Sequence, residues 1–246
     1  RICRGDVYLH RCEFSVEAAR VPFGRRSVGE KQDAMPLIVV GVSHKTAPVE
    51  LREKIVLSPQ SIEKILTEKA AVSPLKETVI LSTCNRTELY GIAETENEAL
   101  CRTFFKEQVS SVPSDEYIYS KSEKEMVTHL FSVAGGLDSL VVGETEILKQ
   151  VKDAYHLAHQ KNATGKIFNV LFQRALYAGK MVRTKTAIGY GATSVGSVAV
   201  SLSEKIFGDL SKSSVLIVGA GKMAEVSARY LASKKVRQLH VANRTL

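Results

Sequence analysis

One short apolar run that leads directly into a glycine turn constrains the fold of this chain more than any other feature. Residues 215–218 are four β-prone apolar residues, and the turn after them opens an amphipathic helix. In a nucleotide-binding turn, one glycine permits the tight bend, another lets backbone N–H groups approach a pyrophosphate, and a small residue lets the helix pack closely on the strand. The predicted cofactor-binding residues of this turn are Gly219, Ala220, Gly221, Lys222, Met223 and Ala224. The pattern predicts a doubly wound, Rossmann-type α/β domain, with a glycine turn that binds no phosphate as the alternative.

The residues after the next predicted strand indicate which dinucleotide would bind. Residues 239–242 form a second apolar run, and Asn243, Arg244 and Thr245 follow it. An NAD site usually has an acidic residue here, which holds the ribose 2′-hydroxyl. Arg244 between two neutral polar residues instead suits a 2′-phosphate. We therefore expect NADPH rather than NADH, with a solvated loop arginine as the alternative.

A cysteine close to an arginine, directly after another apolar run, predicts a reactive site. Residues 78–81 favour a buried strand, and Cys84 and Arg86 follow it. A thiol is nucleophilic only as its thiolate, which a nearby fixed positive charge stabilises. A guanidinium also binds a carboxylate through two parallel hydrogen bonds. Cys84 would then lie at a strand end, where a rigid scaffold displays reactive groups. A small Cys that only packs in the core is the alternative.

These two motifs occur in one order with several others, and together they resemble one enzyme family. The motifs are GVSHKTAP at residues 41–48, LRE at 51–53, STCNRTELY at 82–90, GLDSLVVGE at 136–144, and then the glycine turn and Asn-Arg-Thr. From about Met35 to its last residue, the chain resembles glutamyl-tRNA reductase. Several motifs of this length in one order are far more specific than the glycine turn alone.

The resemblance implies the NADPH-dependent reduction of glutamyl-tRNA(Glu) to glutamate-1-semialdehyde. This reaction is the first committed step of tetrapyrrole synthesis by the five-carbon route, through 5-aminolevulinate to porphyrins. Cys84 would attack the aminoacyl ester to give a thioester and free tRNA, and hydride from NADPH would reduce the thioester to the aldehyde. Arg86 would clamp a substrate carboxylate, and Thr83 and Asn85 would supply neighbouring polar contacts.

Further site residues follow from the same resemblance. Those that match positions for recognition of the amino acid are Ser139, Glu144 and Gln150. Thr145 and Glu146 stand where many members of the family carry Pro-Gln or Gly-Gln, and this departure weakens their predicted role in substrate binding.

Two histidines are candidates for the site. The resemblance makes His129 the candidate for proton handling near the thiol, and hence a catalytic residue. On its own predicted helix, His129 lies on or beside the apolar face, so a satisfied buried histidine is the alternative. His44 follows a predicted strand, and both site lining and ordinary loop polarity remain open for it.

The net charge of +8 is unevenly distributed. The chain has no acidic residue between Asp153 and Glu204, and the basic residues inside this interval are Lys161, Lys166, Arg174, Lys180, Arg183 and Lys185. A basic face suits a polyanion such as tRNA, because each neutralised phosphate releases counterions. A solvated helix face is the alternative.

Cysteine usage and hydropathy exclude several classes of protein. The four cysteines form no CxxC pair, which argues against a zinc site and against a secreted disulfide scaffold. No apolar run approaches the ~18 residues of a membrane span. We therefore expect a soluble enzyme without a metal in a reducing compartment, with Cys101 packed in the core.

The order of the predicted elements favours an α+β domain over a small antiparallel sheet. Thr95 with Glu98 and Ser122 with Glu125 have capping-box spacing, and each pair predicts the start of a helix. The other expected elements are strands at residues 37–42, 77–81 and 88–93, a helix opened by Ser58 and Pro59, and helices at about 144–160, 166–185 and 194–207.

Three segments organise the chain. Residues 1–34 have little apolar content after Phe23, so we expect a poorly ordered leader upstream of a natural start at Met35. A transit peptide, which would place the protein in the plastid stroma rather than the cytoplasm, is the rival, although the acidic residues weaken it. We expect residues 35–190 to form the catalytic domain and residues 191–246 to form part of the nucleotide-binding domain.

The chain ends soon after the second predicted strand of the nucleotide-binding part. One βαβ unit cannot complete a nicotinamide site, so we expect a truncated fragment. The resemblance also implies that the full-length protein forms a homodimer through a C-terminal helical domain, and that glutamate-1-semialdehyde aminomutase is a partner.

Two other functional classes stay open. A shikimate-dehydrogenase-like NADP oxidoreductase also combines a glycine turn with Asn-Arg-Thr, but it needs no thiolate. A non-catalytic tRNA-binding module would bind tRNA without any turnover.

Overall fold

The computed structural model describes residues 36–68, 73–93, 98–109, 114–189 and 194–244. The predictions for the leader at 1–34, for the cap at Thr95 and for Thr245 lie outside these residues. The described residues fall into two parts, one before residue 190 and one after residue 193.

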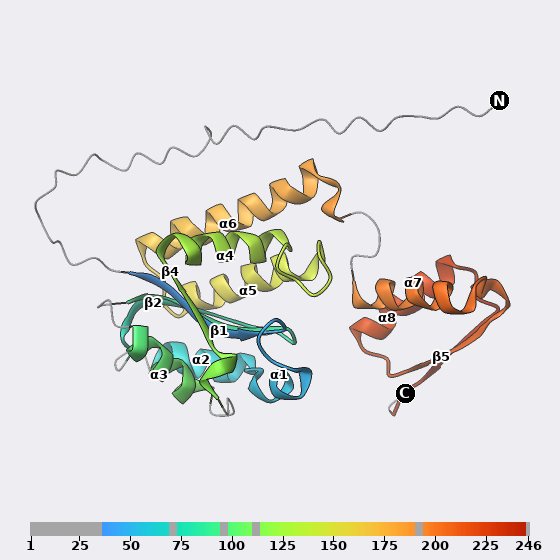
Figure 1. Ribbon diagram of the computed structural model, residues 1–246, viewed down its shortest axis with the longest axis horizontal. Helices are drawn as coiled ribbons and strands as arrows, with labels where there is room; N and C mark the ends of the chain where they lie inside the picture. The colour runs from blue at the N-terminus through green and yellow to red at the C-terminus, as the bar shows by residue number, and fades with distance from the viewer. Residues whose placement is uncertain (1–35, 69–72, 94–97, 110–113, 190–193, 245–246) are drawn as a thin grey trace, which may run out of the picture. The chain divides into compact units, whose positions relative to one another are not determined.

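A four-stranded antiparallel sheet forms the centre of the first part (Figure 1). Its strands are β1 (Leu37–Ser43), β2 (Leu75–Ser82), β3 (Arg86–Ala93) and β4 (Tyr119–Ser122), in the order β2-β3-β1-β4. Every residue of β3 is buried, and so is nearly all of β1, because both strands lie inside the sheet and both sheet faces are covered. The predicted small antiparallel sheet is therefore confirmed.

Helices cover both faces of this sheet (Figure 1). One face carries α1 (Val49–Ile55), α2 (Pro59–Glu68) and α3 (Glu98–Gln108), and the other carries α4 (Glu123–Gly135) and α5 (Glu146–Gln160). Helix α6 (Lys166–Lys185) packs against α4 and α5 on the side away from the sheet. Aromatic rings join these layers, since Phe172 of α6 stacks on Tyr155 of α5 at 5.7 Å and meets Tyr90 of β3 edge-on at 5.7 Å.

The start of α4 agrees with the predicted helix start. Ser122 is the residue before the helix, although its side chain makes no cap hydrogen bond, and its backbone still pairs with Ile38 at the end of β4. Glu123 begins the helix, and its carboxylate accepts a hydrogen bond from the Leu37 backbone N–H at 2.9 Å. The short, polar strand β4 had no signal in the sequence pattern.

The second part contains one parallel βαβ unit and a helix that leads into it. Strands β5 (Ser214–Val218) and β6 (Gln238–Ala242) are parallel, and α8 (Lys222–Ser233) connects them. Helix α7 (Val195–Phe207) opens with a capping box between Ser194 and Ser197 and packs against α8. This arrangement confirms the Rossmann-type start that the glycine turn predicts, together with the helix expected at 194–207.

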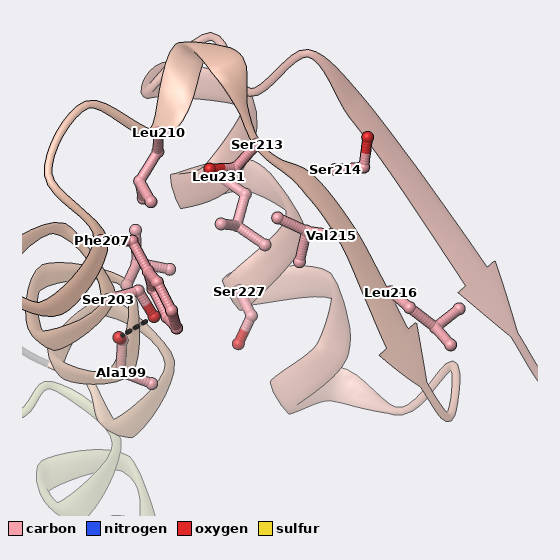
Figure 2. Close-up of a pocket in the computed structure, with 11 residues that line it drawn as sticks. Ala199, Ser203, Phe207, Leu210, Ser213, Ser214, Val215, Leu216, Ser227 and Leu231 are labelled. Atoms are coloured by element: carbon pink, nitrogen blue, oxygen red, sulfur yellow. Dashed lines mark hydrogen bonds between the residues drawn. The ribbon is translucent and has the colours of Figure 1, made fainter.

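A mostly apolar groove of about 390 Å³ lies between α7, α8 and β5 (Figure 2). Phe207, Leu210, Val215 and Leu231 line it, and Figure 2 shows their side chains converging on the space between the two helices and the strand. No residue of the glycine turn lines the groove. The groove is therefore separate from the predicted cofactor site.

Among the described residues, no helix is both long enough and apolar enough to cross a membrane. Within the same residues, no three His, Cys, Asp or Glu side chains cluster in a way that could hold a metal ion.

Candidate active site

Cys84 lies exposed at the tip of the turn that joins β2 to β3. Thr83 builds this turn, because its hydroxyl oxygen accepts the backbone N–H groups of Asn85 at 3.1 Å and Arg86 at 3.2 Å. The Thr83 N–H also donates to the Arg86 carbonyl at 2.7 Å. Thr83 is buried, so its main role here is to hold the thiol in place, whereas the sequence predicted a contact with substrate.

Arg52 of α1 holds the same turn from the other side. Its Nη1 donates to the Cys84 carbonyl and to Asn85 Oδ1, both at 2.8 Å. Arg52 belongs to the LRE motif, but nothing in the local pattern around Cys84 connects it with the thiol. The structure thus identifies Arg52 as a guanidinium fixed at the reactive turn, and places Asn85 in contact with it.

Beneath the turn lies a cluster of hydrogen bonds centred on Glu88, which is fully buried. Its carboxylate accepts from Arg86 Nη1 at 2.7 Å and from Tyr90 Oη at 2.5 Å, contacts His129 Nε2 at 3.0 Å, and accepts from the Tyr119 hydroxyl. Burial alone would raise the pKa of Glu88, but the charge of Arg86 and the hydrogen bonds from His129 and Tyr119 hold that pKa well below its usual range. The cluster therefore contains an ionised carboxylate in the protein interior.

His129 is buried beside this carboxylate, at 9% exposure. A charged Glu88 favours a hydrogen on the Nε2 atom that faces it, which leaves Nδ1 as the ring nitrogen available to exchange a proton. The side chain of His129 also lines a cavity of about 540 Å³ together with Asp138, Lys121 and residues of α4. Cys84 does not line this cavity, so the cavity approaches the Glu88 cluster without including the thiol.

Arg86 connects the thiol turn with the loop at 136–144. Its side chain is 1% exposed, and both terminal nitrogens donate to protein groups. Nη1 contacts Asp138 Oδ2 at 3.0 Å as well as Glu88, and Nη2 donates to the Asp138 carbonyl. Arg86 therefore fastens the loop at 136–144 to the sheet, and its contact with a substrate carboxylate stays a prediction.

Asp138 lies between two cations. Lys45, with 60% of its side chain exposed, forms a salt bridge with the carboxylate that also contacts Arg86. Burial would raise the pKa of Asp138, but the hydrogen bond from Lys45 and the charge of Arg86 lower it. The Asp138 carboxylate is therefore held as an ion between Lys45 and Arg86.

Besides Arg52 Nε, two buried polar atoms near the turn have no hydrogen-bond partner among the described residues. They are Ser139 Oγ, in a residue that is 7% exposed, and His44 Nδ1. The His44 backbone N–H donates to the Asn85 carbonyl at 2.8 Å, which puts His44 beside the turn. Burial and the charge of Arg86 lower the pKa of His44, so its imidazole is neutral at neutral pH. Because an unsatisfied buried polar group costs about 1–3 kcal/mol, both atoms favour a bound polar ligand.

The remaining predicted substrate residues lie at or near the start of α5. The Glu144 carbonyl accepts a hydrogen bond from Arg183 Nη2 of α6 at 2.5 Å. Thr145 is the exposed residue before α5, Glu146 is its first residue, and Gln150 is half-buried in its second turn. The hydrogen bonds of the described residues do not connect these four side chains with Cys84, and their role in binding stays a prediction.

The glycine turn has the features that a pyrophosphate requires. Gly219 adopts φ +106°, in the left-handed region, and its N–H donates to the Ala242 carbonyl at 2.7 Å. Gly221 precedes α8 without any side-chain cap, and a Cβ placed at either glycine would meet nothing within 4 Å. Open space therefore faces uncapped N–H groups at a helix N-terminus, which is a ready anion site.

The other predicted cofactor residues surround this turn. Ala220, Lys222 and Met223 lie at the end of the turn and the start of α8, and Ala224 is half-buried in the first turn of that helix. Asn243 and Arg244 are exposed directly after β6. The described residues fit a dinucleotide, and Arg244 is accessible to a 2′-phosphate.

Comparison with known proteins agrees with this geometry. Residues 40–186 match the sequence family described as Glutamyl-tRNAGlu reductase, N-terminal domain. Residues 201–246, which include the glycine turn, match the family described as Shikimate / quinate 5-dehydrogenase. The first match contains the whole thiol site and the second contains only the nucleotide-binding part.

Proteins that are similar to this chain over most of its length are named glutamyl-tRNA reductase. The glutamyl-tRNA reductase of Brevibacillus brevis is 42% identical over 216 residues, which cover 86% of this chain and 48% of that protein. That of Thermus thermophilus is 44% identical over 212 residues, which cover 86% and 52%. A solved structure, glutamyl-tRNA reductase from Methanopyrus kandleri, has a TM-score of 0.60 at 36% identity and covers 87% of this chain and 50% of its own.

This chain spans about half the length of the curated relatives that it matches. The N-terminal family match includes Cys84, the Glu88 cluster and the loop at 136–144, and it accounts for more than half of the chain. The chain therefore belongs to the glutamyl-tRNA reductase family.

Proposed function

We propose that residues 36–189 form the glutamyl-transfer site of an NADPH-dependent reductase that acts on glutamyl-tRNA(Glu). The observation that carries this proposal is an exposed thiol at the tip of a turn that buried Thr83 and charged Arg52 hold rigidly. A nucleophile needs such fixation, because a small misplacement of reacting atoms lowers the rate strongly.

The first half-reaction transfers the glutamyl group to the protein. The Cys84 sulfur attacks the ester carbonyl, a C–S bond forms, the C–O bond to the terminal ribose breaks, and tRNA leaves with a restored hydroxyl. His129 is the candidate to move the proton, through the ring nitrogen that does not face Glu88. The unpartnered Ser139 hydroxyl is available to a polar group of the bound glutamyl moiety.

The second half-reaction requires a reductant. NADPH, when bound, supplies the hydride that converts the thioester to the aldehyde of glutamate-1-semialdehyde and returns the thiol. Gly219 and Gly221 would let the pyrophosphate approach the backbone, and Arg244 would contact the 2′-phosphate. Homodimer formation, an aminomutase partner and a cytoplasmic or stromal location extend this proposal and rest on the family resemblance alone.

Transfer of radiolabelled glutamate tests the proposed function. We would incubate the chain with glutamyl-tRNA that carries labelled glutamate and measure label retained on denatured protein. We expect retention in wild type and in Cys101→Ser, whose side chain is buried in the core, and no retention in Cys84→Ser.

Label on the Cys84→Ser protein would refute the thiol mechanism. Salt-sensitive tRNA binding without any label on wild type would instead favour a non-catalytic tRNA-binding module. The match at residues 201–246 leaves a shikimate-dehydrogenase-like enzyme as a further alternative. Such an enzyme would show neither label on the protein nor tRNA binding.

A further inference from the structure

The outward face of α6 is basic. Its exposed cations are Lys166, Arg174, Lys180 and Lys185. Two further cations of the same sequence interval are engaged elsewhere, since Lys161 pairs with Glu63 and Arg183 donates to backbone carbonyls. The structure therefore divides the basic interval into internal contacts and an open face.

Among the described residues, no carboxylate forms a salt bridge with the cations of this open face. Exposed lysines of other helices pair with acids, as Lys149 does with Asp153 at 3.0 Å, but the salt bridges of the described residues include none of the four outward cations of α6. Val170 and Tyr177, at 57% and 61% exposure, lie between these cations. Solvation of the cations does not explain an exposed aromatic ring among them. An unpaired nucleic-acid base stacks on such a ring.

The C-terminal end of α6 adjoins the loop at 136–144, which is connected to the thiol turn through Arg86. Arg183, in the last turn, binds the Glu144 carbonyl at the end of the loop at 136–144. The same loop contacts Arg86 through Asp138, and Arg86 belongs to the turn that displays Cys84. A helix of 20 residues extends roughly 30 Å, so the basic face runs that far away from this loop.

The shape of the face favours RNA over a lipid surface. A membrane-binding helix needs a free apolar side, but Phe168, Phe172 and Ala175 of α6 are buried against neighbouring helices. Lys166, Arg174 and Lys180 lie roughly 12 and 9 Å apart along the helix axis, a spacing that suits successive contacts along a phosphate backbone.

We infer that the outward face of α6 binds the backbone of the tRNA acceptor arm and directs its 3′ end past the loop at 136–144 to Cys84. This inference rests on the proposed function, because the ester that Cys84 attacks is at that 3′ end. The cations attract phosphates without reading sequence, and Tyr177 stacks on an unpaired base near the end of the arm.

The test compares two double variants with the same change in charge. Lys166→Glu/Lys180→Glu reverses the face, and Lys205→Glu/Lys212→Glu reverses two exposed lysines of the nucleotide-binding part. The probe is a fluorescently labelled, uncharged tRNA(Glu) transcript, titrated with the full chain at several salt concentrations. We expect the α6 variant to bind at least ~10-fold more weakly, with a salt slope smaller by about 2, and the control to bind as wild type does.

A second readout separates this inference from the proposed function. Label transfer from glutamyl-tRNA to Cys84 should slow in the α6 variant at limiting tRNA and recover at high tRNA, because the thiol site is intact. Unchanged binding by the α6 variant, or equal weakening in the control, would overturn the inference. Absence of label on wild type would overturn the proposed function, while the binding curves would still decide whether α6 holds RNA.

Discussion

The thiol site and the glycine turn are built in opposite ways. Cys84 stands on a buried network whose members come from β3, β4, α4 and the loop at 136–144. The glycine turn consists of a few consecutive residues, and its two glycines, Gly219 and Gly221, face open space. A site made of distant contacts depends on the whole fold, whereas a site made of one turn depends on backbone angles, and substitutions should reveal this difference.

Glu88→Gln should have the largest effect on stability. The variant leaves the buried Arg86 charge with Asp138 as its remaining carboxylate partner, and breaking a buried ion pair in this way typically costs about 3–5 kcal/mol. The matched control is Glu204→Gln, because Glu204 forms a partly exposed salt bridge with Lys234 and should change stability by at most about 1 kcal/mol. Urea unfolding measures both, and similar losses in the two variants would show that the Glu88 cluster does not support the fold.

Two glycine substitutions should separate backbone strain from ligand contact. Gly219→Ala should lose about 1–2 kcal/mol of stability, because its φ of +106° disfavours any side chain. Gly221→Ala should fold normally, since its φ is −76° and a Cβ there meets no protein atom, but the methyl group would intrude on the pyrophosphate. Unfolding curves and NMR shifts on addition of NADPH measure the two effects, and unchanged NADPH binding by Gly221→Ala would contradict the assignment.

Arg52→Ala should slow glutamyl transfer to Cys84 by roughly tenfold, because it frees the turn on which the thiol lies. Lys54→Ala, two residues further along the same helix, is the control and should transfer at the wild-type rate, because Lys54 is exposed. Equal rates for Arg52→Ala and wild type would show that the Thr83 hydrogen bonds suffice.

Asp138→Asn should produce the smallest effect, and the difference from wild type should disappear at acidic pH. The pKa of Asp138 is lowered in the folded protein, so its stabilisation is present above the unfolded pKa of ~3.9 and is lost as pH falls through the lower folded value. Between pH 5 and pH 3, wild type should therefore lose more stability than Asp138→Asn does. Equal slopes of unfolding free energy against pH would contradict the ion pair with Lys45 and Arg86.

The sequence predicted those features that depend on nearby residues. The glycine turn, the small antiparallel sheet and the long helices α5 and α6 follow local periodicity, and the structure confirms them. Cys84 was recognisable because a strand end and a short motif surround it.

Features that depend on residues far apart in the chain were missed. Arg52 is 32 positions from Cys84, so no local pattern joins them. Asp138 is 52 positions from Arg86, so the contact between these two side chains had no local signal either. Glu88 was not predicted as a site residue, since a carboxylate in a strand gives no sign that it will be buried among four hydrogen-bonding side chains from β3, β4 and α4.

The most direct test of this account is the rate at which glutamate is transferred from tRNA to Cys84 in three proteins: wild type, Gly221→Ala and Cys84→Ser. We predict equal rates for wild type and Gly221→Ala, because residues 36–189 hold the thiol site, with the label mapped by mass spectrometry to the peptide that contains Cys84. Cys84→Ser should acquire none. Label at another residue, or a transfer rate that falls with the glycine turn, would contradict the claim that the thiol site is complete without the nucleotide-binding part.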